Sequence, residues 1–276
     1  MTLVPVDSQG LLDPEDVRRI IRPDTILVSL MHGNNETGVL FPIASVGRMC
    51  RERGVPFHTD AVQSFGKVAL DVEALHVDLL SLSGHKIYGP KGIGALWIRR
   101  GTMMQPLLRG GAQERSRRAG TENVAAAVGL ARATELSLQD AEGAGTRMAD
   151  LRDQLERGLM EALPGVLRNG HPNVRLPHTT NLAFAGVEAE SLILALDLSG
   201  VGVSSGAACS SGSLEPSHVL TAMGLARERV LSSVRFSLGR TTTGEQIERV
   251  LEVLPEIVAR MRRVNGSLIP PVGAHA

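Results

Sequence analysis

The sequence has few cysteines, few aromatic residues and no excess of charge of either sign. Two cysteines among 276 residues are too few for a disulfide framework or a cysteine metal cage, so we expect no metal site and a reducing, cytoplasmic setting. The 29 basic and 29 acidic residues cancel, and we therefore expect neither nucleic acid nor a membrane surface as a partner. No apolar run approaches the ~20 residues of a membrane span.

The residues that are present predict a globular α/β chain. Short β-rich runs alternate with helical segments in the first half, which indicates a largely parallel sheet. The expected strands there are 25–30, 56–59, 77–82 and 95–98, and the expected helices are 42–53 and 121–135. The second half is expected to hold strands at 181–184, 201–204 and 234–238 and helices at 189–198 and 243–263, the last one starting in a capping box.

A glycine-rich break at 142–145, followed by an expected helix over 146–163, predicts a domain boundary. We expect a large domain over 1–142, a small C-terminal domain over 143–263 and a mobile tail over 264–276. The first residues do not look like the start of a domain, so we also expect that upstream sequence belongs to the large domain.

Lys86 is the strongest catalytic candidate. It follows an apolar run within Ser83-Gly84-His85-Lys86, at the end of an expected strand. Burial of an amine favours its neutral form, which can attack a carbonyl and form a Schiff base. Ser83 and His85 can donate hydrogen bonds to an anion, and Gly84 lets the backbone approach it closely. The same lysine could instead be an ordinary surface residue in a turn.

Other polar residues follow strand ends, where ligands bind in α/β sheets. Asp60 could keep a pyridine nitrogen protonated, which would make the ring an electron sink, or it could equally be a helix cap. Gln63 could form a hydrogen bond with a phenolic oxygen. Asn35 lies in a turn whose amides could bind substrate or cofactor oxygens, although it could equally be an ordinary polar turn. Arg235, inside an expected strand, could bind a substrate carboxylate with two parallel hydrogen bonds or form a structural ion pair.

The two cysteines differ in their surroundings. Cys50 lies on the expected helix 42–53 with apolar residues at helical spacing, which predicts a core residue. Cys209 lies in a stretch of serine, glycine and alanine without an apolar stripe. An exposed thiol in such a loop is a candidate nucleophile, or else an unremarkable loop cysteine.

Taken together, six motifs resemble the cysteine desulfurases of the class V aminotransferase group, which use pyridoxal 5'-phosphate (PLP). In chain order they are HGNNETG (32–38), HTDAVQ (58–63), SGHKIYGPKG (83–92), GGAQE with RAGTEN (110–114 and 118–123), SSGAACS (204–210) and VRFSLGR (234–240). The resemblance implies the fold type I of PLP-dependent transferases, with a mostly parallel large domain and a C-terminal α+β domain. The cysteine loop resembles the subgroup that supplies sulfur for iron–sulfur cluster assembly.

The resemblance also implies roles in cofactor binding. Lys86 would hold PLP covalently and then move protons. Asp60 would pair with the pyridine nitrogen and Gln63 with the ring oxygen. The remaining implied cofactor residues are Asn35, Ser83, Gly84, His85 and Thr121, the last contributed by the partner subunit of a homodimer.

For the substrate, the resemblance implies that Asn35 and Arg235 orient the carboxylate of L-cysteine. Cys209 would attack the substrate sulfur, leaving a persulfide for a sulfur-acceptor or scaffold protein and releasing L-alanine. A selenocysteine lyase is the nearest alternative, and a non-catalytic remnant that only dimerises or binds a partner is another. Family members also carry an upstream phosphate-binding turn and a histidine that stacks on the cofactor. We therefore expect this chain to start inside the large domain and to bind PLP weakly or not at all by itself.

Overall fold

The computed structural model describes residues 1–139, 141–206 and 216–266. They form two compact units. Unit 1 comprises Met1–Ile20, Gly33–Phe41 and the described residues of Glu142–Ala276, and unit 2 comprises Ile21–His32 and Pro42–Ala141. The last change of unit lies between residues 141 and 142, one residue before the expected boundary. The two N-terminal segments of unit 1 were not foreseen. The domain limits 1–142 and 143–263 stay a prediction.

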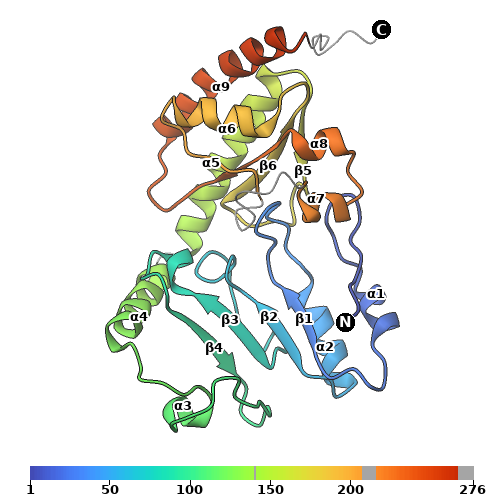
Figure 1. Cartoon of the computed structure of the whole chain (residues 1–276), viewed down its shortest axis with the longest axis vertical. Helices are drawn as coiled ribbons and strands as arrows, with labels where there is room; N and C mark the ends of the chain where they lie inside the picture. Colours follow the sequence, from blue (N-terminus) through green and yellow to red (C-terminus); the bar gives the residue numbers. More distant parts are fainter. Residues whose placement is uncertain (140, 207–215, 267–276) are drawn as a thin grey trace. The chain divides into compact units, whose positions relative to one another are not determined.

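Unit 2 is built on a four-stranded sheet whose strands run in the order β1-β2-β3-β4 (Figure 1). Its strands are β1 (Val28–Met31), β2 (Phe57–Asp60), β3 (Leu79–Ser83) and β4 (Gly94–Ile98). The first three are parallel and β4 is antiparallel to β3. All four expected strands are therefore confirmed, with ends shifted by at most three residues. Because β1, β2 and β3 run in one direction, the ends at Met31, Asp60 and Ser83 lie at the same edge of the sheet.

Helices pack against this sheet and fix the turn after β3. They are α2 (Ile43–Glu52), the short 3₁₀ helix η1 (Gly84–Ile87), α3 (Gln113–Ser116) and α4 (Val124–Gln139). The turn that contains η1 rests closely on α4, because a Cβ at Gly129 would lie 2.6 Å from Pro90 Cγ and one at Gly89 would lie 3.1 Å from Ala133 Cβ. Such close approach holds the backbone around Lys86 in one place.

Unit 1 contains a three-stranded antiparallel sheet in the order β5-β6-β7. Its strands are β5 (Val166–Asn169), β6 (Thr179–Phe184) and β7 (Ser233–Ser237). Its helices are α1 (Pro14–Ile20), α5 (Ala141–Ala162), α6 (Ala189–Asp197), α7 (His218–Ala222), α8 (Arg227–Leu231) and α9 (Gly244–Val264). Every residue of the central strand β6 is buried, as expected of a strand covered on both faces. The core joins this sheet to α5, α6 and α9, with Leu155, Leu192 and Leu254 among its fully buried side chains.

Two local predictions were wrong and one was confirmed. Residues 142–145 lie within α5, where Ala144 and Gly145 are buried, so packing outweighs the ~1 kcal/mol helix penalty of a glycine. Residues 201–204 form only an isolated bridge from Ser204 to Arg235. The capping box of α9 is confirmed, since Thr243 Oγ1 accepts from Gln246 N at 3.4 Å and Thr243 N donates to Gln246 Oε1 at 3.2 Å.

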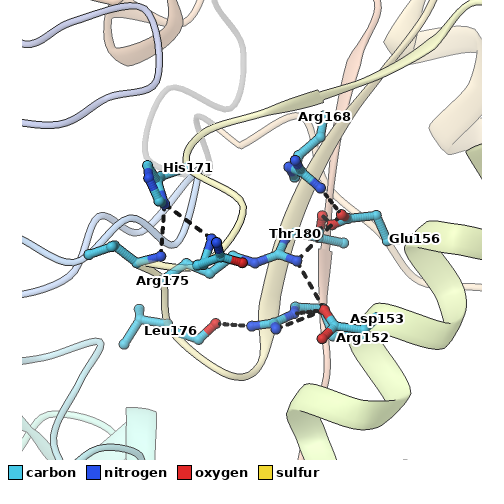
Figure 2. Close-up of polar contacts among 10 residues, drawn as sticks. Arg152, Asp153, Glu156, Arg168, His171, Arg175, Leu176 and Thr180 are labelled. Carbon is cyan, nitrogen blue, oxygen red and sulfur yellow. Dashed lines mark hydrogen bonds and ion pairs between the residues drawn. The ribbon is translucent and has the colours of Figure 1, made fainter.

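A buried polar network fastens α5 to the sheet of unit 1 (Figure 2). The Glu156 carboxylate accepts hydrogen bonds from Arg175 Nη1 at 2.6 Å, from Thr180 Oγ1 at 2.7 Å and from Arg168 Nη1. Burial alone would raise the pKa of the Glu156 carboxyl, but the hydrogen bonds from Arg175, Thr180 and Arg168 outweigh it and hold the pKa below its usual value. The ionised carboxylate therefore stabilises the fold.

We expect Glu156→Gln to lower the free energy of unfolding by about 3 kcal/mol at pH 7, because it leaves buried guanidinium groups without their counterion. Glu156 stabilises the fold fully above its ordinary pKa of 4.5 and loses this contribution as the pH falls below that value. The difference from the unaltered protein should therefore shrink in urea unfolding at pH 4. The control Glu252→Gln breaks the exposed pair with Arg249 and should cost less than about 1 kcal/mol. Equal losses for the two variants would contradict the expectation.

Candidate functional site

The end of β2 presents Asp60 at the edge where the parallel strands finish. Its side chain is half-buried, and Asp60 Oδ1 accepts a hydrogen bond from Val62 N at 2.8 Å. This local bond holds the carboxylate beside the turn that contains Gln63. Asp60 and Gln63 thus lie together just past a strand end, as expected from the sequence.

The end of β3 leads directly into η1, which contains Lys86. Ser83 Oγ and His85 Nδ1 are hydrogen bonded at 2.8 Å, so these two polar groups lie side by side. The Gly84 amide donates to the carbonyl of Ile93 at 2.9 Å, and its role toward an anion stays a prediction. Because Asp60 pairs with Ser81 in the sheet register, the β2 and β3 residues share one edge of unit 2.

Two histidines, the buried His32 and the half-buried His58, connect segments at this edge. His58 Nδ1 and Ser29 Oγ are 2.8 Å apart, as are His58 Nε2 and Ser81 Oγ. Burial lowers the pKa of His58, against the opposing effect of the Asp60 charge. His32 Nδ1 lies 3.0 Å from Ser64 Oγ, and burial lowers the pKa of His32 too. Neutral imidazoles thus connect the strands and the turn after β2.

In unit 1 the structure brings Asn35 and Arg235 together. Arg235 Nη1 donates to the carbonyl of Asn35 at 2.8 Å and to that of Gly206 at 3.3 Å. Asn34 Oδ1 accepts from the backbone amides of Glu36 and Thr37 at 2.9 Å each, which shapes the turn around Asn35. These contacts support a shared role for Asn35 and Arg235 without testing substrate binding.

Three further sequence predictions have different outcomes. Thr121 lies exposed in the irregular segment before α4, and its role stays a prediction. Cys209 lies outside the described residues. Cys50 is confirmed as a fully buried core residue of α2, where burial and the Asp78 charge raise the pKa of its thiol to about 11. A thiol with that pKa is protonated at neutral pH and is a poor nucleophile.

The residues at the edge of unit 2 fit the chemical groups of PLP. The Lys86 amine matches the aldehyde of PLP, and the Asp60 carboxylate matches its pyridine nitrogen. The hydrogen-bonded pair of Ser83 and His85 matches its phosphate. Within the described ranges, no group of three or more His, Cys, Asp or Glu side chains is arranged to hold a metal ion. Sequence reasoning missed Lys67, whose ammonium donates to the backbone carbonyls of Gln63 and Lys86 at this edge.

Comparison with known proteins identifies the family. The model of the class V aminotransferases matches residues 1–250, and the chain belongs to that family. Its relatives include cysteine desulfurase IscS of Methanosarcina thermophila, 51% identical over 265 residues, which are 96% of this chain and 65% of the relative. Cysteine desulfurase NifS of Azotobacter vinelandii is 49% identical over 262 residues, covering 95% of this chain and 65% of the relative.

A solved structure supports the fold. The NifS-like protein of Rickettsia africae ESF-5 superposes with a TM-score of 0.85 at 35% identity, over 93% of this chain and 69% of that one. The expected type I fold of PLP-dependent transferases is thereby confirmed. The chain spans about two thirds of the length of these curated relatives. None of the helices in the described part of the chain is long and apolar enough to cross a membrane.

Proposed function

We propose that the chain has the activity of a PLP-dependent cysteine desulfurase. Such an enzyme converts L-cysteine to L-alanine and passes the sulfur on as an enzyme persulfide. The observation that carries this proposal is the common edge of unit 2, where Asp60 and Ser83 end neighbouring parallel strands and Lys86 follows in η1. Membership of the class V aminotransferases and curated relatives named cysteine desulfurase support it. We further propose a cytoplasmic homodimer that delivers sulfur to an acceptor or scaffold protein for iron–sulfur clusters.

Bound PLP would supply an electron sink for the carbanion formed at the substrate α-carbon. Lys86 would hold the cofactor covalently and carry a proton on its Nζ. The Asp60 carboxylate would accept the pyridine N–H, and Gln63 would donate to the ring oxygen. The other proposed cofactor contacts are Asn35, Ser83, Gly84, His85 and Thr121, with Thr121 acting across the dimer.

The sulfur transfer balances without an added oxidant. Arg235 and Asn35 would hold the substrate carboxylate, which leaves the substrate thiol to react with Cys209. The carbon–sulfur bond of L-cysteine breaks and a sulfur–sulfur bond to Cys209 forms. The carbon takes up a proton to give alanine, so one cysteine and one protein thiol yield one alanine and one persulfide.

The test is a single-turnover assay of the chain with excess PLP and L-cysteine, in the absence of a reductant. We expect alanine and Cys209 persulfide to form in equal amounts, measured by amino-acid analysis and by mass spectrometry of the protein. Repeating the assay with selenocysteine separates the two substrate classes, since a selenocysteine lyase would turn over only that substrate. Failure to form alanine from L-cysteine would contradict the proposal.

A further inference from the structure

Lysine is rare in this chain, and each lysine lies in unit 2. The 276 residues contain 26 arginines but only three lysines, which are Lys67, Lys86 and Lys91. Lys86 is the proposed cofactor residue, and Lys91 is exposed in the turn after η1. Lys67 is half-buried and is not among the proposed cofactor contacts. Nearly all the basic residues of the chain are thus arginines, yet a lysine, Lys67, lies beside the proposed cofactor site.

The Lys67 ammonium joins two segments of that site. Lys67 Nζ donates to the carbonyl of Gln63 at 3.3 Å and to the carbonyl of Lys86 at 3.2 Å. Gln63 belongs to the turn after β2, and Lys86 belongs to η1 after β3. One side chain thus bonds the backbones of two residues whose own side chains are proposed to contact PLP.

The surroundings of Lys67 suit a compact ammonium better than a guanidinium. The turn before it presses on α4, because a Cβ at Gly66 would lie 2.9 Å from Ser137 Cβ. Burial, and then repulsion from the Lys86 charge, lower the pKa of Lys67 to about 8, so the amine is still mostly protonated at pH 7. An ammonium carries three donors on a small head, whereas the flat fork of an arginine needs more room.

We propose that Lys67 is a positioning residue of the cofactor site, which fixes the spacing between Gln63 and Lys86 by bonding both backbone carbonyls. The inference rests on the proposed function, and it assigns to Lys67 no contact with the cofactor itself. Without the ammonium, η1 and the turn after β2 are no longer joined at this point. Lys86 and Gln63 then lose the alignment that lets one PLP molecule contact both.

The test compares Lys67→Met with Lys91→Met in the full chain. Methionine keeps most of the apolar stem and removes the ammonium, and Lys91 supplies a matched exposed position in the same unit. PLP affinity is measured by absorbance titration. Losing a charged hydrogen bond at Lys67 should weaken PLP binding about tenfold, and Lys91→Met should leave the affinity unchanged.

A structural role is separated from a positioning role by a third variant. Val46→Ala opens a cavity in α2, where Val46 is fully buried, and should lower the melting temperature without weakening PLP binding. Equal PLP affinities for Lys67→Met and the unaltered chain would overturn the proposal. The proposal would also be overturned if Val46→Ala and Lys67→Met lowered the melting temperature equally and weakened PLP binding equally. Because the chain is expected to bind PLP weakly, the titration is carried to saturating PLP. The absence of any spectral change with the unaltered chain even there would instead overturn the proposed function, and the role of Lys67 with it.

Discussion

Lys86→Ala is expected to abolish turnover of L-cysteine and the absorbance of protein-bound PLP together. The variant removes the amine at the end of β3, which is the proposed covalent attachment point and proton carrier. Loss of the proton-transfer group alone should slow the reaction by about a hundredfold or more. The measurements are the absorbance spectrum after addition of PLP and the rate of alanine formation.

Lys91→Ala is the matched control for this experiment. Lys91 lies five residues further along the chain and is exposed, so its loss should leave both readouts close to those of the unaltered protein. Normal turnover by Lys86→Ala would show that another group holds the cofactor. Loss of activity in both lysine variants would point to a general effect of charge.

Cys209→Ser is expected to stop sulfide release while leaving PLP binding intact. A serine hydroxyl cannot take up the substrate sulfur as a persulfide, and Cys209 is proposed to have no part in holding the cofactor. Sulfide release is measured with a thiol reductant present, and PLP binding is measured by absorbance. The expected fall in sulfide release is complete within the sensitivity of the assay.

Cys50→Ser provides the contrast, because the Cys50 thiol is buried and has a pKa of about 11. This variant should retain sulfide release and lose about 1–3 kcal/mol of stability, since it buries a hydroxyl in an apolar site. Sulfide release that survives Cys209→Ser but not Cys50→Ser would show that the proposed nucleophile is the wrong cysteine.

Much of the edge that holds the candidate site could be predicted from the sequence. Asp60 and Ser83 each follow a short β-rich run, and parallel strands bring such ends together. The helical spacing of apolar residues around Cys50 likewise predicted its burial. In these places the local pattern and the tertiary structure agree.

Other contacts depend on tertiary geometry that no local pattern carries. The bond from Lys67 to the Lys86 carbonyl spans 19 residues and requires the turn after β2 to meet η1. The glycines at 143 and 145 predicted a break between helices, but buried residues around them in α5 pack into unit 1 and keep the helix continuous. The role of Thr121 stays a prediction from the resemblance alone, and the role of Cys209 stays a prediction from its loop composition and the resemblance.

The hydrogen bond between Arg235 and the Asn35 carbonyl joins residues that are 200 positions apart in the chain. At a synthesis rate of about 5–20 residues per second, the ribosome needs roughly 10–40 s to make that stretch. Ala141 is the last residue of unit 2, so the residues of unit 2 in this chain leave the ribosome before most of unit 1. The Asn35 turn must wait, because its partners in unit 1 emerge last. Unit 1 is held together by contacts between residues far apart in the sequence, and such contacts form slowly. Assembly of unit 1 should therefore be the slowest step in folding of the new chain.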